Sequence, residues 1–174
     1  MAGTAESGIN AAMSNLFQGA AYVFTPQSKP DKQTSPESAA QNLATLQQLA
    51  LSLGAKPFIC SSQVHDRSVA WISHLPVMVS AGLVAACLGE KDSDVLELAQ
   101  SLASSGFRDT SRVGAGNPEL GTMMAEYNSE SLLRSLYAYR ENLDQIIALI
   151  ETQNWQDLSK ILTANYQARP KYLN

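Results

Sequence analysis

The spacing of apolar and polar residues divides the chain into a short mixed segment and a longer helical one. Residues 20–25 form a β-prone run that Pro26 ends, and residues 56–61 form a second run of the same kind. Between them, Ser35-Pro36-Glu37 is typical of a helix start, because serine caps the helix, proline fits its first turn and an acid favours the dipole. Gly54 is the expected end of that helix. Strand, helix and strand in this order predict a βαβ-like unit with a parallel sheet, and two strands indicate the end of a larger sheet.

From residue 63 onwards the pattern is helical. One long helix is expected over residues 64–88, with a kink at Pro76. Later apolar repeats predict further helices over residues 93–103, 118–127, 130–153 and 155–166. We therefore expect two parts, residues 1–62 with α/β character and residues 63–174 forming a helical domain.

The segment 69–88 has the length of a membrane span, since 15 of its 20 residues are apolar. Its polar residues include His74, which would be costly to place in lipid. A helix that is apolar on all sides is also what a domain core or a dimer interface requires. We favour a buried helix, and we expect a homodimer because this segment is too apolar to be left exposed.

Composition narrows the classes of partner and compartment. The net charge is −4 and no basic stripe is visible, so nucleic acid is not an expected partner. Cys60 and Cys87 both have apolar neighbours, which predicts buried thiols in a reducing compartment such as the cytoplasm. The first residues lack the basic and apolar regions of a signal peptide, and a membrane location is not expected.

A polar segment, residues 104–112, separates two helical stretches, and we expect a loop there. It holds Arg108, Asp109 and Arg112 in a chain with only 12 Lys and Arg residues. Arginine is suited to a bidentate grip on a carboxylate, and Gly106 permits close approach by a ligand. The segment therefore indicates a small anionic ligand; the alternative is a solvated turn in which Asp109 pairs with an arginine at the surface.

His65 and His74 are the candidate acid–base residues. Nine steps of about 100° place them on opposite faces of an unbroken α-helix, so a metal site shared by the two is not expected. Either residue alone is more often a hydrogen-bonded polar residue than a catalyst. His74 is the better functional candidate, because the expected kink at Pro76 frees backbone groups beside it. Asp66 can equally serve the dipole of the helix start.

Three motifs carry a resemblance to a known family. Residues 65–76 read HDRSVAWISHLP, residues 103–112 read ASSGFRDTSR, and residues 116–120 read GNPEL. They resemble the H-D-x-x-x-A-x-x-S-H-L-P, G-F-[RK]-D-x-[TS]-R and G-[DN]-P-E-L motifs of the prephenate/arogenate dehydrogenase family. The similarity covers essentially the whole chain, and its nearest type is the arogenate-using, NADP-dependent branch.

The resemblance implies a mostly α fold with two parts. The C-terminal part of a Rossmann-like, nucleotide-binding α/β domain is followed by an all-α dimerisation domain like the C-terminal domain of 6-phosphogluconate dehydrogenase. Residues 1–4, MAGT, match the end of the family's H-P-M-A-G-T motif. Its histidine is the family's catalytic base and would fall two positions before Met1, so no catalytic residue is assigned within the chain. The Gly-rich cofactor motif is likewise expected upstream, and this chain alone is expected to be inactive.

The implied reaction is the oxidative decarboxylation of arogenate or prephenate in tyrosine biosynthesis, with NADP as the oxidant and NAD as the alternative. The motif match implies that Arg112 binds the ring carboxylate. The other residues that the resemblance places near the site are Ser73, His74 and Thr4 in the substrate pocket, Gly3 and Thr4 at the cofactor, and His65, Asp66 and Asp109 in supporting positions.

Two positions depart from the family pattern. Many prephenate-using members have a histidine where this chain has Val77, which favours arogenate, a substrate without the pyruvyl keto group. The family often has tryptophan where this chain has Gly121. The alternative to an enzyme is a non-catalytic helical dimerisation module or pseudo-enzyme.

Overall fold

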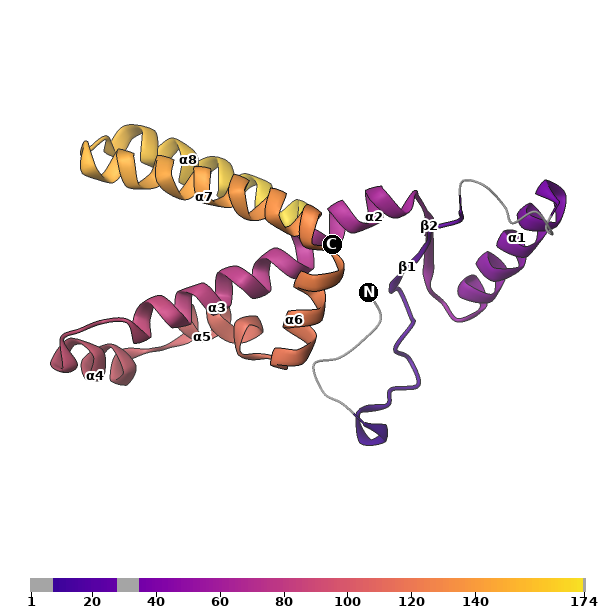
Figure 1. The fold of residues 1–174 in the computed structure, drawn as a ribbon, viewed down its shortest axis with the longest axis horizontal. Coiled ribbons are helices and arrows are strands. Elements are labelled where there is room, and N and C mark those ends of the chain that lie inside the picture. The colour runs from indigo at the N-terminus through magenta and orange to yellow at the C-terminus, as the bar shows by residue number, and fades with distance from the viewer. Residues whose placement is uncertain (1–7, 28–34, 174) are drawn as a thin grey trace. The chain divides into compact units, whose positions relative to one another are not determined.

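The structure, a computed structural model, describes residues 8–27 and 35–173 (Figure 1). Gly3 and Thr4 lie outside the described residues. The chain divides into two compact units, Met1–Ser129 and Glu130–Asn174.

The first unit begins with a small α/β portion. After a single 3-10 turn, η1 (Ile9–Ala11), come strand β1 (Ala21–Phe24), helix α1 (Pro36–Ser52) and strand β2 (Lys56–Ile59). The strands pair in parallel with Ala21 opposite Lys56, which confirms the predicted βαβ-like unit. The Ser35 hydroxyl accepts a hydrogen bond from the Ser38 amide and caps α1 as expected. Gly54 follows α1 with a φ of 76°, a conformation that favours glycine.

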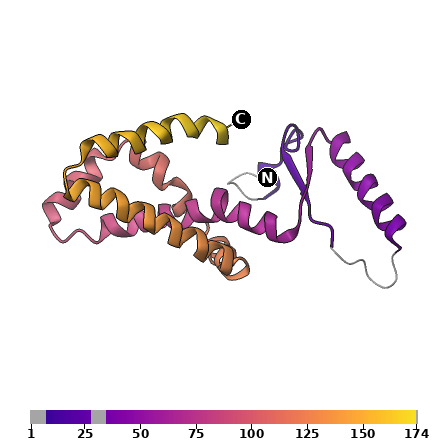
Figure 2. The same cartoon turned by 90° about the horizontal axis from the view of Figure 1, so that it is seen from above.

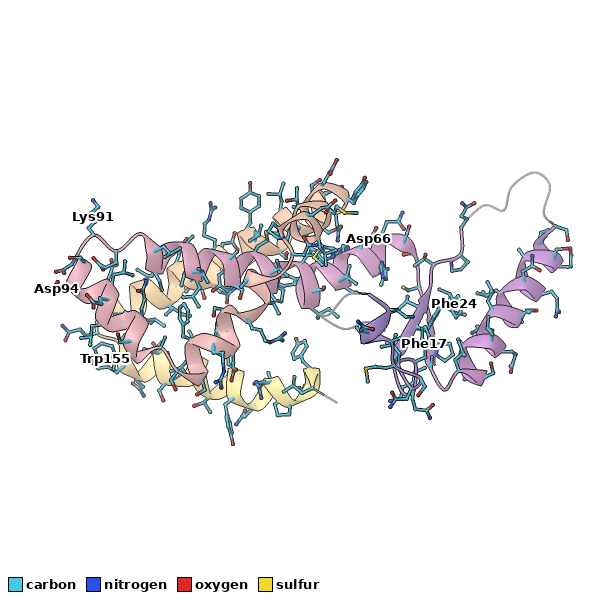
Figure 3. All side chains as sticks on the ribbon, turned by 90° about the horizontal axis from the view of Figure 1, so that it is seen from below. Phe17, Phe24, Asp66, Lys91, Asp94 and Trp155 are labelled. Atoms are coloured by element: carbon cyan, nitrogen blue, oxygen red, sulfur yellow. The ribbon has the colours of Figure 1, made fainter. Side chains whose placement is uncertain are left out.

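Aromatic side chains from β1 and the preceding turn cluster beside the two strands (Figure 3). The ring of Tyr22 lies 6.3 Å from that of Phe17 and 5.2 Å from that of Phe24, measured between centroids. On β2, Phe58 and Ile59 are each at least half exposed. The two strands therefore present much of their apolar surface to solvent, which is unusual for a completed sheet.

A continuous helical run, Ser62–Leu88, follows the strands. It consists of α2 (Ser62–Val69), a π-helical turn η2 (Ala70–His74) and α3 (Leu75–Leu88). The π turn ends just before Pro76, the position of the predicted kink, and proline cannot donate the backbone hydrogen bond that an unbroken α-helix needs there. By length and composition alone the run could cross a membrane.

Four shorter elements complete the first unit. They are α4 (Ser93–Leu102), α5 (Ser105–Ser111), the 3-10 helix η3 (Arg112–Ala115) and α6 (Pro118–Tyr127). The loop predicted over residues 104–112 is therefore wrong, because most of it is helix α5. The hydroxyls of Thr110 and Ser111 donate to the carbonyls of Gly106 and Phe107 one turn earlier, so these polar side chains are satisfied by the helix itself.

Small residues hold η3 against α3. A Cβ added at Gly114 would lie 2.3 Å from the backbone nitrogen of Ala81, so only glycine permits this approach. The buried Ser80 hydroxyl donates to the Thr110 carbonyl. This contact fixes the start of η3, where Arg112 lies, relative to the middle of α3.

The second unit contains α7 (Ser129–Glu151), α8 (Trp155–Ala168) and a final 3-10 turn, η4 (Arg169–Tyr172). A tight turn joins the two helices, with Gln153 at a φ of 51° and the Asn154 side chain accepting from the Asp157 amide. The two helices diverge from this turn (Figure 2). The apolar stripe expected on α7 is present but largely exposed, as at Tyr137 and Ile150.

The prediction of two buried thiols is wrong for Cys87, which is exposed, while Cys60 is half-buried. Cys87 lies in the last turn of α3, where Leu88 is also 62% exposed. The apolar sequence around Cys87 therefore does not coincide with burial in the single chain.

Candidate functional site

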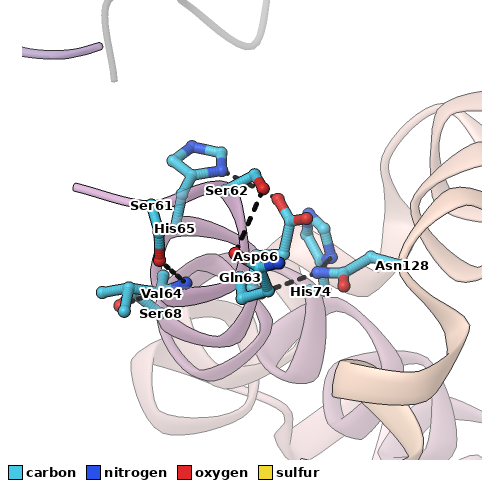
Figure 4. A network of polar contacts seen from close by, with 9 residues as sticks. All are labelled: Ser61, Ser62, Gln63, Val64, His65, Asp66, Ser68, His74 and Asn128. Atoms are coloured by element: carbon cyan, nitrogen blue, oxygen red, sulfur yellow. Dashed lines mark hydrogen bonds and ion pairs between the residues drawn. The ribbon is translucent and has the colours of Figure 1, made fainter. Parts of the chain in front are cut away.

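Four polar residues, three from the run Ser62–Leu88 and one from the end of α6, meet at the π turn (Figure 4). Asn128, the residue that ends α6, places its Nδ2 atom 2.8 Å from the carbonyl oxygen of Asp66 and 3.3 Å from Nδ1 of His74. The Asp66 carboxylate lies 2.9 Å from Nδ1 of His65. The structure thus brings together three of the predicted residues, His65, Asp66 and His74, and adds Asn128.

The environment of His74 favours its neutral form. Burial lowers its pKa below the usual value for histidine, the Asp66 carboxylate opposes this shift, and His65 adds to it. The net pKa is lowered, so the imidazole is uncharged at neutral pH. A neutral imidazole has one donor nitrogen and one acceptor nitrogen, which suits it to bind a polar ligand without adding charge.

The π turn changes the geometry that the sequence predicted for the two histidines. The expectation of opposite faces assumed an unbroken α-helix between His65 and His74. The five residues Ala70–His74 are instead π-helical. A π turn has more residues per turn than an α-helix, so it changes the direction in which His74 points relative to His65. His65 contacts Asp66, its neighbour in the chain, and the Asp66 carboxylate also acts electrostatically on His74, at the far end of the π turn. Among the described residues no cluster of three metal-ligating side chains occurs.

The two arginines of α5 and η3 have different surroundings. Arg108 lies 3.4 Å from its neighbour Asp109, and both side chains are more than two-thirds exposed. This is the surface pairing that the sequence left open as an alternative. Arg112, at the start of η3, is exposed and forms no ion pair within residues 8–27 and 35–173. Of the two, Arg112 is therefore the cation available to an anionic ligand.

An apolar pocket of about 400 Å³ lies between α3, η3 and α6. It is lined by Val77, Met78, Ala81, Val113, Gly114, Gly116, Asn117, Pro118, Gly121, Thr122 and Ala125. A Cβ at Gly121 would lie 3.8 Å from Val77 Cγ1, so the two positions that depart from the family pattern face one another. Val77 follows His74 by one helical turn, and Val113 follows Arg112 directly. The pocket walls thus come from η3, which holds Arg112, and from α3 and α6, which directly adjoin His74 and Asn128.

The remaining predicted residues have simpler positions. Ser73 is half-buried within the π turn, next to His74. Thr4 and Gly3 are outside the described residues. Sequence reasoning missed Asn128; the available signal was a polar residue placed between two predicted helices, where a side-chain amide can bond to other elements.

Comparison with known proteins gives the family. The model of the prephenate dehydrogenase dimerization domain matches residues 61–164. Prephenate dehydrogenase of Bacillus subtilis is 28% identical over 158 residues, which are 91% of this chain and 40% of that protein. The crystal structure of Synechocystis arogenate dehydrogenase matches with a TM-score of 0.85 and 56% identity, over 98% of this chain and 58% of that one. Prephenate dehydrogenase from Aquifex aeolicus, in complex with hydroxyphenyl propionate and NAD+, shares the fold with a TM-score of 0.85 at 23% identity.

The fold and the matched region define a mostly helical protein with a small parallel α/β portion and a dimerisation-type helical domain. The chain belongs to the prephenate dehydrogenase family, whose named members above are dehydrogenases. It spans 40% of the length of the Bacillus subtilis protein and 58% of the Synechocystis protein.

Proposed function

We propose that this chain provides the substrate-binding and dimerisation part of an NADP-dependent arogenate dehydrogenase of tyrosine biosynthesis, acting in the cytoplasm. The observation that carries the proposal is the 56% identity to Synechocystis arogenate dehydrogenase over 98% of the chain. A role as a dimerisation module without catalysis is the second candidate, supported by the match of residues 61–164 to a dimerization domain.

In this proposal Arg112 binds the ring carboxylate of the substrate. The exposed guanidinium has no ion-pair partner within the described ranges, and the packing of Gly114 on α3 holds its backbone in place. Arginine forms two parallel hydrogen bonds with a carboxylate, so it fixes both the position and the orientation of the ring. His74, neutral and half-buried, donates a hydrogen bond to a substrate oxygen, with Ser73 beside it.

The apolar pocket supports arogenate over prephenate. A histidine at position 77 would add a hydrogen-bonding group to the wall where Val77 and Gly121 face one another. That histidine would be a buried donor without a partner if the substrate had no keto oxygen there, and such a donor is costly. An apolar wall at this place therefore suits a substrate that lacks the pyruvyl keto group.

The chain does not by itself account for binding of the dinucleotide's pyrophosphate. The sequence contains no G-x-G-x-x-G turn, whose backbone amides would hold the pyrophosphate. The oxidant and the base that completes its reaction are therefore not assigned to residues 1–174, and these residues alone are not expected to reduce NADP. Their part in the reaction is to bind and orient the ring as it loses hydride and CO2.

The experiment is to replace the matching 58% of Synechocystis arogenate dehydrogenase with this chain. The chimera is expected to reduce NADP with arogenate and to act much more slowly on prephenate. Retained NADP binding and a dimeric mass in light scattering serve as controls for folding. A folded chimera that prefers prephenate would contradict the substrate assignment, and one without any turnover would favour the dimerisation module.

A further inference from the structure

Asn128 contacts two groups of the preceding helical run, and the first of them fixes the orientation of its amide. Its Nδ2 atom lies 2.8 Å from the Asp66 carbonyl oxygen. A carbonyl oxygen can only accept a hydrogen bond, so the Asn128 atom that faces it must be the amide nitrogen. The Asp66 carbonyl also accepts from the Ala70 amide at the start of the π turn, so both of its lone pairs are used.

The second N–H of the Asn128 amide then faces the imidazole of His74. The distance from Nδ2 to His74 Nδ1 is 3.3 Å. A donor that points at Nδ1 requires this nitrogen to be unprotonated. A neutral imidazole carries its single proton on the other nitrogen in that case, and the proton of His74 is therefore on Nε2.

His65 is held in the opposite way by the same aspartate. Its Nδ1 lies 2.9 Å from a carboxylate oxygen of Asp66, and an ionised carboxylate only accepts. The proton of a neutral His65 is therefore on Nδ1. Asp66 accepts a hydrogen bond from His65 through its side chain, and its backbone carbonyl is linked by hydrogen bonds to His74 through Asn128 (Figure 4).

We propose that Asn128 is a positioning residue that keeps His74 in the Nε2–H tautomer, so that the imidazole presents a hydrogen-bond donor to a ligand. Nε2 has no hydrogen-bond partner within residues 8–27 and 35–173, so this nitrogen is free to donate a hydrogen bond to a ligand. The lowered pKa of His74 agrees with a neutral ring. In this state Nε2 cannot take a proton, so His74 binds the ligand and does not act there as a base. That the acceptor is an oxygen of a cyclohexadienyl substrate rests on the proposed function; the tautomer does not.

The test is long-range ¹H–¹⁵N NMR of the labelled chain at pH 8, above the usual histidine pKa of about 6.5. The chain has only two histidines, and His65→Gln assigns their signals. The expected spectrum shows one histidine of each tautomer, with His74 protonated on Nε2. Asn128→Asp is expected to move the His74 proton to Nδ1, because a carboxylate there accepts a hydrogen bond. Asn128→Ala is expected to give a mixture of both tautomers.

Asn117→Asp is the matched control, since Asn117 caps the other end of α6 and its side chain accepts from the Glu119 amide. This variant is expected to leave both histidine signals unchanged. A wild-type His74 protonated on Nδ1 would overturn the proposal, and so would a folded Asn128→Asp variant in which the tautomer of His74 is unchanged. The wild-type spectrum decides the first point even if a variant does not fold. The NMR measurement uses no substrate, so it tests the tautomer independently of the proposed function. A chimera that does not turn over arogenate would refute the proposed function and would leave the tautomer proposal intact.

Discussion

At the scale of single residues, the surroundings of His74 separate it from other polar residues of the chain. Its neighbour Pro76 made it the better candidate in the sequence, and the structure adds partial burial and Asn128. The sequence could not supply Asn128, because the contact joins residues 54 positions apart and depends on how α6 packs. It also could not separate Arg108 from Arg112 by composition; the pairing of Arg108 with Asp109 does so.

The lowered pKa of His74 predicts how stability depends on pH. Because its folded pKa is below the unfolded value of about 6.5, the unfolded chain binds the proton more readily. The contribution to the free energy of unfolding is fully present above pH 6.5 and is lost as pH falls through the lowered folded pKa. Urea unfolding at pH 7.5 and 5.5, at one protein concentration, should show a larger loss for the wild type than for His74→Gln. His65→Gln should retain the loss, and equal losses in the wild type and His74→Gln would contradict this assignment.

At the scale of elements, most helices and both strands could be predicted from the sequence. The serine cap before Pro36 and the parallel strand pair were predicted and are observed, because caps and short-range periodicity are local signals. The π turn was not predicted, since it depends on how Pro76 is accommodated inside a continuous helical run. Helix α5 was missed because its hydroxyl side chains look like a loop in sequence, although they bond to carbonyls one turn earlier.

At the scale of the whole molecule, the single chain leaves many apolar side chains exposed in each unit. In the second unit, Tyr166 is 82% exposed and Leu162 is 57% exposed on α8. In the first unit, an apolar groove of about 580 Å³ lies between α3, α4 and α5, and includes Cys87 and Phe107. Surfaces of this kind usually mark an interface, and the match to a dimerization domain points to a second copy of the chain.

A homodimer therefore follows as a prediction for the purified chain. Light scattering should give about twice the chain mass of 18.7 kDa. Ile147→Glu, which places a charge on the exposed apolar stripe of α7, should shift the population toward monomer, while Gln145→Glu on the same helix should not. A wild-type chain that is a stable, soluble monomer at all concentrations would contradict the dimer, and with it the inference that a second copy covers the exposed apolar surfaces.

The central claim is that Arg112 holds the ring carboxylate, and steady-state kinetics of the chimera with Synechocystis arogenate dehydrogenase test it most directly. A contact made equally in the ground state and the transition state lowers KM without raising kcat. Arg112→Ala should therefore raise KM for arogenate at least about tenfold, the effect of losing about 1.4 kcal/mol, with little change in kcat. Arg108→Ala, which removes the surface partner of Asp109, should leave both constants nearly unchanged. An Arg112→Ala chimera with unchanged KM and a collapsed kcat would contradict the claim.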